Sequence, residues 1–139
     1  MPIALTDTMA AALDNALVQR SPCLVATASA AGVPDVSYRG SVLVFDAEHL
    51  AFWERAKGET LANLVENPNV VVFYRNSETR QTWRFYGTAE VLKDGPVRLQ
   101  IMERVNQFEL AQDPERTGYA ILIRVDRVRE RSDTVMVRE

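Results

Sequence analysis

Six short segments of the sequence have the character of β-strands, and most of them are joined by brief turns. They are rich in β-branched and aromatic residues, and the last alternates plainly, with Ile121, Ile123 and Val125 on one side. The six expected strands are residues 23–28, 35–45, 50–54, 70–75, 82–92 and 119–128. Short connections favour antiparallel pairing. We therefore predict a mainly β protein whose antiparallel sheet closes into a small barrel; the alternative is an open sheet with helices on one face.

Three further segments carry helical spacing and are expected at the margins of the barrel. The first, about residues 8–20, places Met9, Leu13 and Leu17 four residues apart. The other two are about residues 60–66 and 97–110. With 139 residues, 47% of them hydrophobic, the chain can bury one sizeable core. We expect a single domain over residues 1–139.

Charge and cysteine content limit the cellular compartment and the classes of binding partner that we expect. A net charge of −3 and a pI near 5.3 argue against nucleic-acid binding, which normally needs a basic excess. No apolar run is long enough to cross a bilayer, and the N-terminus does not resemble a secretory signal. With only one cysteine there is no intrachain disulfide, so we expect a cytoplasmic protein without a membrane partner. Cys23 stands in an apolar run and is expected to be a buried, inert thiol.

A basic turn before a short helix is the clearest candidate for ligand binding. Arg55 and Lys57 follow the expected strand 50–54, and the expected helix begins at Thr60. Free backbone N–H groups at a helix start, with a hydroxyl and cations nearby, favour a phosphate or another anion. The alternative is a solvated cationic turn.

The expected strand 35–45 changes character along one face. Period-two alternation places Ser37, Arg39 and Ser41 on this face, and the residues that follow there are apolar. Such a face could run from the core into a pocket or a subunit contact. A bulge at Gly40 would explain the same pattern without a ligand.

Two residues in other strands have both a structural and a functional interpretation. Trp53 could pack in the core or stack against a ligand beside the basic turn. Arg84 could pair with a carboxylate across the sheet, or it could reach a bound anion.

The sequence lacks the usual residues of metal or nucleophilic catalysis. His49 is the only histidine, so neither a zinc cluster nor a Cys–His pair is supported, and we predict no metal site. No Gly-rich phosphate or dinucleotide motif is present, and no catalytic residue is assigned. Several acidic residues are interpreted as solvated surface charges: Asp7, Asp14, Glu103, Glu109, Asp113 and Glu115. This pattern suits a protein that borrows its reactive group and only has to hold a cofactor.

Five segments, in this order, resemble the pyridoxamine 5′-phosphate oxidase-like proteins, which bind flavin in a split β-barrel. The segments are residues 32–41, 50–55, 57–64, 67–70 and 84–91. The likeness covers about residues 22–91 and is closer to the short flavin-binding members than to the full oxidase. It implies a six-stranded antiparallel split barrel that forms a homodimer, with flavin mononucleotide (FMN) in clefts at the subunit interface.

The resemblance also implies which residues bind FMN. The strand that borders the flavin ring contains Ser37, Tyr38, Arg39, Gly40 and Ser41. The strand end beneath the ring and ribityl chain contains Trp53, Glu54 and Arg55. The phosphate turn contains Lys57 and Thr60, and the following hairpin contributes Arg84.

The chain departs from the family at one position of the phosphate turn. Many members carry a lysine immediately before the threonine, where this chain has Glu59. A carboxylate there would repel the phosphate unless it points away. Lys57 and Arg55 would then have to supply the positive charge.

We expect an FMN-binding oxidoreductase with a small-molecule electron donor or acceptor and an unassigned substrate. Oxidation of pyridoxamine 5′-phosphate itself is not expected, because the substrate-phosphate residues of the oxidase C-terminus have no recognisable counterpart. One alternative is a carrier or sensor of flavin, deazaflavin or haem without turnover, in which His49 would be a poor haem ligand. Another is a barrel that has lost its ligand and acts only as a structural dimer.

Overall fold

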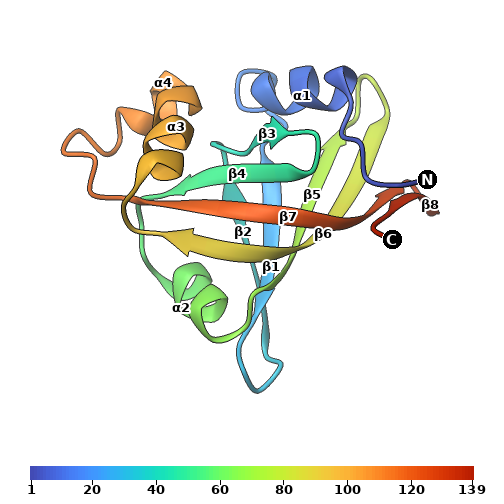
Figure 1. Cartoon of the computed structure of the whole chain (residues 1–139). Coiled ribbons are helices and arrows are strands. Elements are labelled where there is room, and N and C mark those ends of the chain that lie inside the picture. Colours follow the sequence, from blue (N-terminus) through green and yellow to red (C-terminus); the bar gives the residue numbers. More distant parts are fainter.

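The computed structural model describes all residues from Met1 to Glu139 and shows a mainly β chain (Figure 1). The strands are β1 (Cys23–Ala28), β2 (Pro34–Arg39), β3 (Leu43–Asp46), β4 (His49–Glu54), β5 (Asn69–Asn76), β6 (Gln81–Leu92), β7 (Tyr119–Glu130) and β8 (Asp133–Val137). The helices are α1 (Asp7–Asp14), α2 (Glu59–Glu66), α3 (Pro96–Arg104) and α4 (Gln107–Leu110). All strands belong to one antiparallel sheet, in the order β2-β1-β5-β6-β7-β4-β3, with β8 paired to β7.

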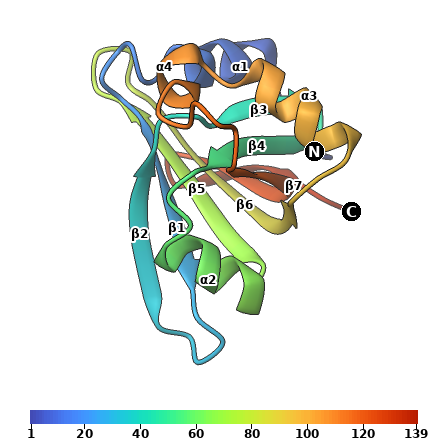
Figure 2. The same ribbon diagram turned by 90° about the vertical axis from the view of Figure 1, so that its left-hand side faces the viewer.

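The sheet closes on itself without joining its two edges. β2 and β3 lie at opposite ends of the strand order, yet only Gly40, Ser41 and Val42 separate them in the sequence. The sheet must therefore curl round, and Figure 2 shows β1 and β2 running across the direction of β4 and β7. A turn joins the edges instead of a hydrogen-bonded ladder, so the barrel is split. The predicted fold class, a mainly β antiparallel split barrel, is confirmed.

The predicted number of strands is wrong in two places. Residues 35–45 were expected as one strand, but the chain leaves the first edge after Arg39 and starts the second edge at Leu43. The change of character along this segment thus marks a crossing between edges, not a bulge within one strand. The eighth strand, β8, was not expected and pairs with the end of β7.

Two predicted helices are also shorter than expected. The segment 97–110 is interrupted because Val105 and Asn106 are extended, with ψ of 142° and 147°. The Asn106 side chain then accepts a hydrogen bond from the Glu109 N–H and starts α4. The first helix is regular only over Asp7–Asp14, capped by Thr6. None of the helices has the length and apolarity that a bilayer crossing requires.

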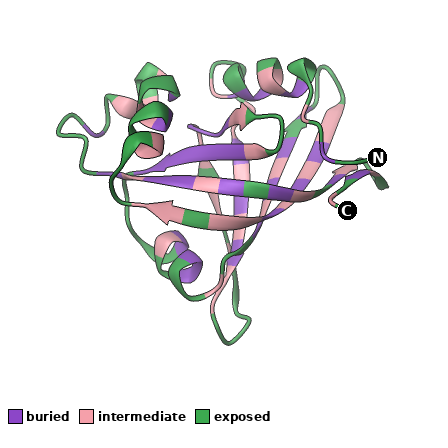
Figure 3. Ribbon diagram, viewed as in Figure 1, coloured by how far each residue is buried: buried purple, intermediate pink, exposed green.

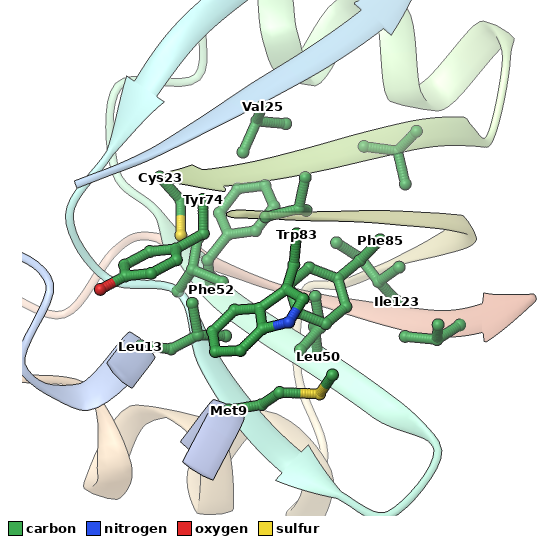
Figure 4. Close-up of a cluster of buried hydrophobic side chains, with 14 of the residues drawn as sticks. Met9, Leu13, Cys23, Val25, Leu50, Phe52, Tyr74, Trp83, Phe85 and Ile123 are labelled. Atoms are coloured by element: carbon green, nitrogen blue, oxygen red, sulfur yellow. The ribbon is translucent and has the colours of Figure 1, made fainter. Parts of the chain in front are cut away.

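The main core fills the inside of the barrel and is closed at one end by α1 (Figure 4). Tyr74 and Trp83 stack there with ring centroids 5.5 Å apart. Met9 and Leu13 pack against this cluster from α1. Cys23 is also buried, and burial raises the pKa of its thiol to about 12. The prediction of a buried thiol is confirmed, and this thiol stays protonated at neutral pH.

A smaller second core attaches α3 to the outer side of β4. Alternate residues of β4 serve the two cores: Leu50 and Phe52 face the barrel interior, whereas Ala51 and Trp53 contact the α3 side. β4 is therefore buried on both faces, while the far sides of α3 and α4 are exposed (Figure 3). The end of this rigid strand, at Trp53 and Glu54, is where the predicted site begins.

Candidate functional site

An ion pair joins the ends of β2 and β4 across the split of the barrel. Arg39 donates from Nε to Glu54 Oε1 at 2.8 Å and from Nη2 to Oε2 at 3.2 Å. The Glu54 side chain is only 1% exposed, so its carboxylate depends on this bidentate partner in place of water. Because β2 and β4 are not neighbours in the sheet, the pair holds the two sides of the split together.

A second polar contact connects β2 to the start of α2. The hydroxyls of Ser37 and Thr60 lie 2.9 Å apart, and Thr60 is buried. Arg39 Nη1 donates to the Ser37 hydroxyl at 3.0 Å and to the Tyr38 carbonyl at 2.7 Å. The chain Thr60–Ser37–Arg39–Glu54 is thus continuous, and Arg39 donates four hydrogen bonds at its centre.

The start of α2 has free backbone donors beside two lysines. Gly58 is the N-cap residue, and no side chain caps the helix. Lys57 precedes it with a left-handed backbone, φ +54°, and its Nζ lies 4.2 Å from the centroid of the Tyr119 ring. The only other lysine, Lys93, also approaches this ring, with Nζ at 5.6 Å. This end of the helix is therefore electropositive, as the basic turn predicted.

Ser41 and Trp53 are both buried and serve the framework of the site. The Ser41 hydroxyl accepts from the Trp53 backbone N–H at 3.0 Å and donates to its carbonyl at 3.3 Å. The Trp53 indole Nε1 donates to Asp113 Oδ2 at 2.8 Å, and the guanidinium of Arg98 lies over its ring. The structure thus supports the core-packing interpretation of Trp53.

Asp113 was predicted to be a solvated surface charge, and this prediction is wrong because the residue is buried. Its carboxylate is buried and accepts hydrogen bonds from the Trp53 indole and from the Gly118 and Thr117 N–H groups. Burial raises the pKa of the Asp113 carboxyl, but these donors outweigh that effect and hold the pKa below its ordinary value. Asp113 therefore anchors the loop before β7 onto the end of β4.

The short helix α4 covers the turn that crosses the split. Asn106 Nδ2 donates to the Gly40 carbonyl, and a Cβ at Gly40 would lie 2.5 Å from Glu109 Oε1. Glu109 Oε2 is also 3.7 Å from Arg55 Nε, so Glu109 is a contact residue of the site and not a simply solvated charge. The small pocket beneath α4 is lined by Tyr38, Arg39, Gly40, Trp53, Glu54, Arg55, Ala56 and Glu109.

Two predicted site residues lie apart from the others within one chain. The Tyr38 side chain is 68% exposed on the outer face of the sheet. Arg84 also faces outward: its guanidinium lies 4.8 Å from the Phe73 ring centroid and donates to the Arg131 carbonyl. Neither side chain contacts Lys57 or Thr60.

Folding thus brings most of the predicted residues to the split, in three groups. The first is the polar chain of Ser37, Arg39, Glu54 and Thr60; the second is Gly40 and Arg55 beneath α4; the third is Ser41 with Trp53. Sequence reasoning missed Tyr119, Lys93 and Glu109. Tyr119 pairs with Glu54 in the sheet, and only the register of β4 on β7 reveals that neighbour.

Comparisons with known proteins agree with this architecture. Residues 7–132 match the family model described as pyridoxamine 5′-phosphate oxidase. An uncharacterised protein of Methanocaldococcus jannaschii is 32% identical over 128 residues, which cover 91% of this chain and 80% of that protein. HupZ of Group A Streptococcus is 24% identical, with a TM-score of 0.73. The match covers 96% of this chain and 98% of the HupZ chain. An FMN-binding protein of Syntrophomonas wolfei is 14% identical, with a TM-score of 0.71. The match covers 87% of this chain and 82% of the Syntrophomonas chain.

At these low identities, the two solved structures establish a shared fold and nothing finer. The family match, in contrast, runs from α1 to the turn after β7, well beyond the segments that carry the sequence resemblance. The archaeal relative extends over nearly as much of the chain. This chain therefore belongs to the pyridoxamine 5′-phosphate oxidase family.

Proposed function

We propose that the chain is a homodimeric FMN-binding protein that acts as a flavin-dependent oxidoreductase. The observation that carries the proposal is the start of α2, where no side chain caps the helix and Lys57 stands directly before it. Free N–H groups, the helix dipole and an adjacent cation together suit the phosphate of FMN. Membership of the family and the fold shared with the Syntrophomonas protein support this cofactor.

The residues around α2 fit a phosphate group. A side chain at Gly58 would meet nothing within 4 Å, so the space in front of the helix is open. Arg55 is 44% exposed and can add a second positive charge. Glu59 is exposed and forms no ion pair, so nothing holds its carboxylate over the helix start. The buried Thr60 hydroxyl couples this turn to β2 through Ser37.

When bound, FMN supplies hydride and electron transfer at its ring, so the protein has to bind and orient rather than to move protons. Arg39 is engaged by Glu54, Ser37 and the Tyr38 carbonyl. Its role is therefore to fix the backbone of β2 where the ring would lie. The donor or acceptor is a small molecule whose class these contacts do not specify.

A second copy of the chain would complete the site. The outer face of the sheet carries a row of apolar residues, with Tyr38 opposite Leu24 and Leu24 opposite Phe73. Val36, one row away, is 58% exposed. Contiguous exposed apolar surface of this kind is typical of protein–protein contacts. We infer that this face pairs with its copy, so that Tyr38 and Arg84 of one protomer approach the flavin of the other.

The dimer can be tested separately from the cofactor. Changing Val36 and Tyr38 to Glu should give a monomer in light scattering, because like charges would face each other across the interface. Leu99→Glu, on the exposed side of α3, is the matched control and should leave the dimer intact. A Val36→Glu/Tyr38→Glu protein that remains dimeric would reject this interface.

A carrier of flavin without turnover is the second candidate. It is favoured by the mutual neutralisation of Arg39 and Glu54, because the Arg39 guanidinium is already paired with a carboxylate and offers the ring no free charge. Freshly purified protein should show the flavin absorbance bands whether it is an oxidoreductase or a carrier. Anaerobic addition of a reduced nicotinamide should bleach these bands within seconds for an oxidoreductase and leave them unchanged for a carrier. A protein that is colourless and ignores added FMN would overturn both.

A further inference from the structure

Two neighbouring hairpin turns gather arginines at a distance from the split. One turn joins β5 to β6 and contains Arg80, and the other joins β7 to β8 and contains Arg131. They are adjacent because the Arg131 N–H donates to the Thr82 carbonyl at 3.1 Å. Figure 1 shows both hairpins on the side of the molecule away from α2. The arginine cluster of these hairpins consists of Arg75, Arg80, Arg129 and Arg131.

Part of this cluster lines a pocket with no apolar residue. The lining residues are three arginines and two hydroxyl side chains, here called the arginine pocket: Arg75, Ser77, Arg80, Thr82 and Arg131. Arg75 and Thr82 are directly opposite each other in the β5–β6 ladder. No carboxylate lines the pocket, so its only side-chain groups are hydrogen-bond donors and hydroxyls.

The arginines of the cluster have no acidic partner. Four other arginines of the chain lie within 4.0 Å of a carboxylate oxygen, namely Arg39, Arg55, Arg124 and Arg138. None of the four in the cluster does. The acids of the same hairpins are Glu78, Glu130 and Asp133, and of these Glu130 accepts from the Trp83 indole. No carboxylate therefore forms a close ion pair with these guanidinium groups, in a chain whose net charge is −3.

The backbone at the two turns is also unusual for arginine. Arg80 and Arg131 have φ of +61° and +56°, in the left-handed region that glycine and asparagine normally occupy. A Cβ makes this conformation less favourable for arginine than for glycine. The turns thus place arginine where glycine would be easier.

We propose that the arginine pocket binds a small molecule through a multiply charged phosphoryl group, such as a phosphate or a diphosphate. Guanidinium groups are planar forks that match phosphate oxygens in bidentate fashion, and Ser77 and Thr82 add hydroxyl donors. A bound phosphoryl group would supply the missing counterion for three converging cations. The ligand is a small molecule rather than a nucleic acid, because the rest of the chain is acidic and would repel an extended polyanion.

This site differs from the FMN phosphate site proposed at α2. The pocket shares no lining residue with the turn at Lys57 and Thr60, and it stands whether or not that turn binds FMN. Backbone amides report on the two places separately in a two-dimensional ¹H–¹⁵N NMR spectrum: residues 77–82 and 131 for the pocket, residues 58–61 for the start of α2.

The test is a titration of FMN-saturated, ¹⁵N-labelled full-length protein with pyrophosphate. We expect saturable shifts at residues 77–82 and 131, with no return of the residue 58–61 signals to their FMN-free positions. The double variant Arg80→Gly/Arg131→Gly should bind pyrophosphate at least tenfold more weakly. Glycine suits the left-handed turns, so a loss of binding cannot be ascribed to misfolding. The variant Arg80→Lys/Arg131→Lys keeps the charge but loses the fork, and it should fall in between.

A charge-matched control separates the pocket from a general effect of net charge. Arg124→Gln/Arg127→Gln removes two cations from β7 outside the pocket and should leave pyrophosphate affinity within twofold of the unchanged protein. Citrate serves as the carboxylate probe and should bind more weakly than pyrophosphate. Three results would each overturn the proposal: no saturable shift in the pocket, equal loss in the glycine and control variants, or citrate binding as tightly as pyrophosphate.

Discussion

The split of the barrel and the hairpin turns use charged side chains in opposite ways. At the split, Arg39 and Glu54 satisfy each other in a nearly buried pair, and Ser37 and Thr60 extend the contact into α2. At the hairpins, Arg75, Arg80 and Arg131 converge without a carboxylate. The comparison indicates two roles for charged residues. The paired charges at the split hold the backbone in place, whereas the unpaired arginines at the hairpins are free to bind the phosphoryl group that we propose as their ligand.

The largest expected effect comes from breaking the pair at the split. Glu54→Gln leaves the Arg39 guanidinium with a neutral partner in a buried position, and we expect about 3–5 kcal/mol less stability toward urea. Arg131→Gln, at the hairpins, should change the same measurement by less than about 0.5 kcal/mol, since no internal partner is lost. Equal losses in the two variants would show that the two regions do not differ.

Replacing Asp113, another buried carboxylate near the split, should lower stability in a pH-dependent way. Asp113→Asn should lose about 1.5–3 kcal/mol at neutral pH, because charge-assisted hydrogen bonds to Trp53, Gly118 and Thr117 are weakened. The pKa of Asp113 is lower in the folded chain than in the unfolded chain. Its contribution is therefore complete above the unfolded pKa of about 3.9 and is lost as the pH falls through the folded pKa.

Urea unfolding of both proteins between pH 7 and pH 3 measures this contribution. The difference between them should be constant down to about pH 5 and then shrink. A difference that grows as the solution becomes acidic would contradict the assignment of an ionised, buried Asp113.

Tyr74 extends the comparison to a neutral group. Its hydroxyl is buried in the main core and has no hydrogen-bond partner, unlike the hydroxyls of Ser37 and Thr60. Tyr74→Phe should therefore raise the free energy of unfolding by about 1 kcal/mol, since an unsatisfied buried hydroxyl is removed. A destabilisation of that size would mean that the hydroxyl has a partner such as ordered water.

The smallest expected effect concerns the left-handed turns. Arg80→Gly and Arg131→Gly should each raise thermal stability by about 0.5 kcal/mol, because glycine relieves the strained backbone. Arg116 is the control: it has φ of +57°, but its side chain donates to the Leu110 and Asp113 carbonyls. Arg116→Gly should bring no gain, since these bonds are lost together with the strain.

How far the fold could be predicted depends on whether the signal was local. Alternation at Ile121, Ile123 and Val125 identified β7, and the mainly β barrel followed from the short turns. The break at Gly40 could not be predicted, because residues 35–45 remain extended on both sides of the crossing. It depends on which strand each half pairs with, and β2 pairs with β1 whereas β3 pairs with β4.

The candidate site followed the same rule. The basic turn at Lys57 could be predicted because helix start, cation and hydroxyl are close in the sequence. The neighbours of that turn could not be predicted, since Tyr119 and Lys93 reach it only through the register of β7 and the end of β6. Asp113 was misjudged because its burial depends on Trp53, 60 residues away.

Comparing the affinities for FMN and riboflavin shows whether the start of α2 binds the phosphate of FMN. Riboflavin lacks the phosphate, so the ratio of its Kd to that of FMN measures the phosphate contribution alone. We predict a large ratio for the unchanged protein and a reduction of roughly 10- to 150-fold in Lys57→Ala, which corresponds to about 1.5–3 kcal/mol for a charged hydrogen bond. Arg124→Ala, as the control, should keep the original ratio. Equal affinity for FMN and riboflavin, or a ratio that Lys57→Ala leaves unchanged, would contradict the account.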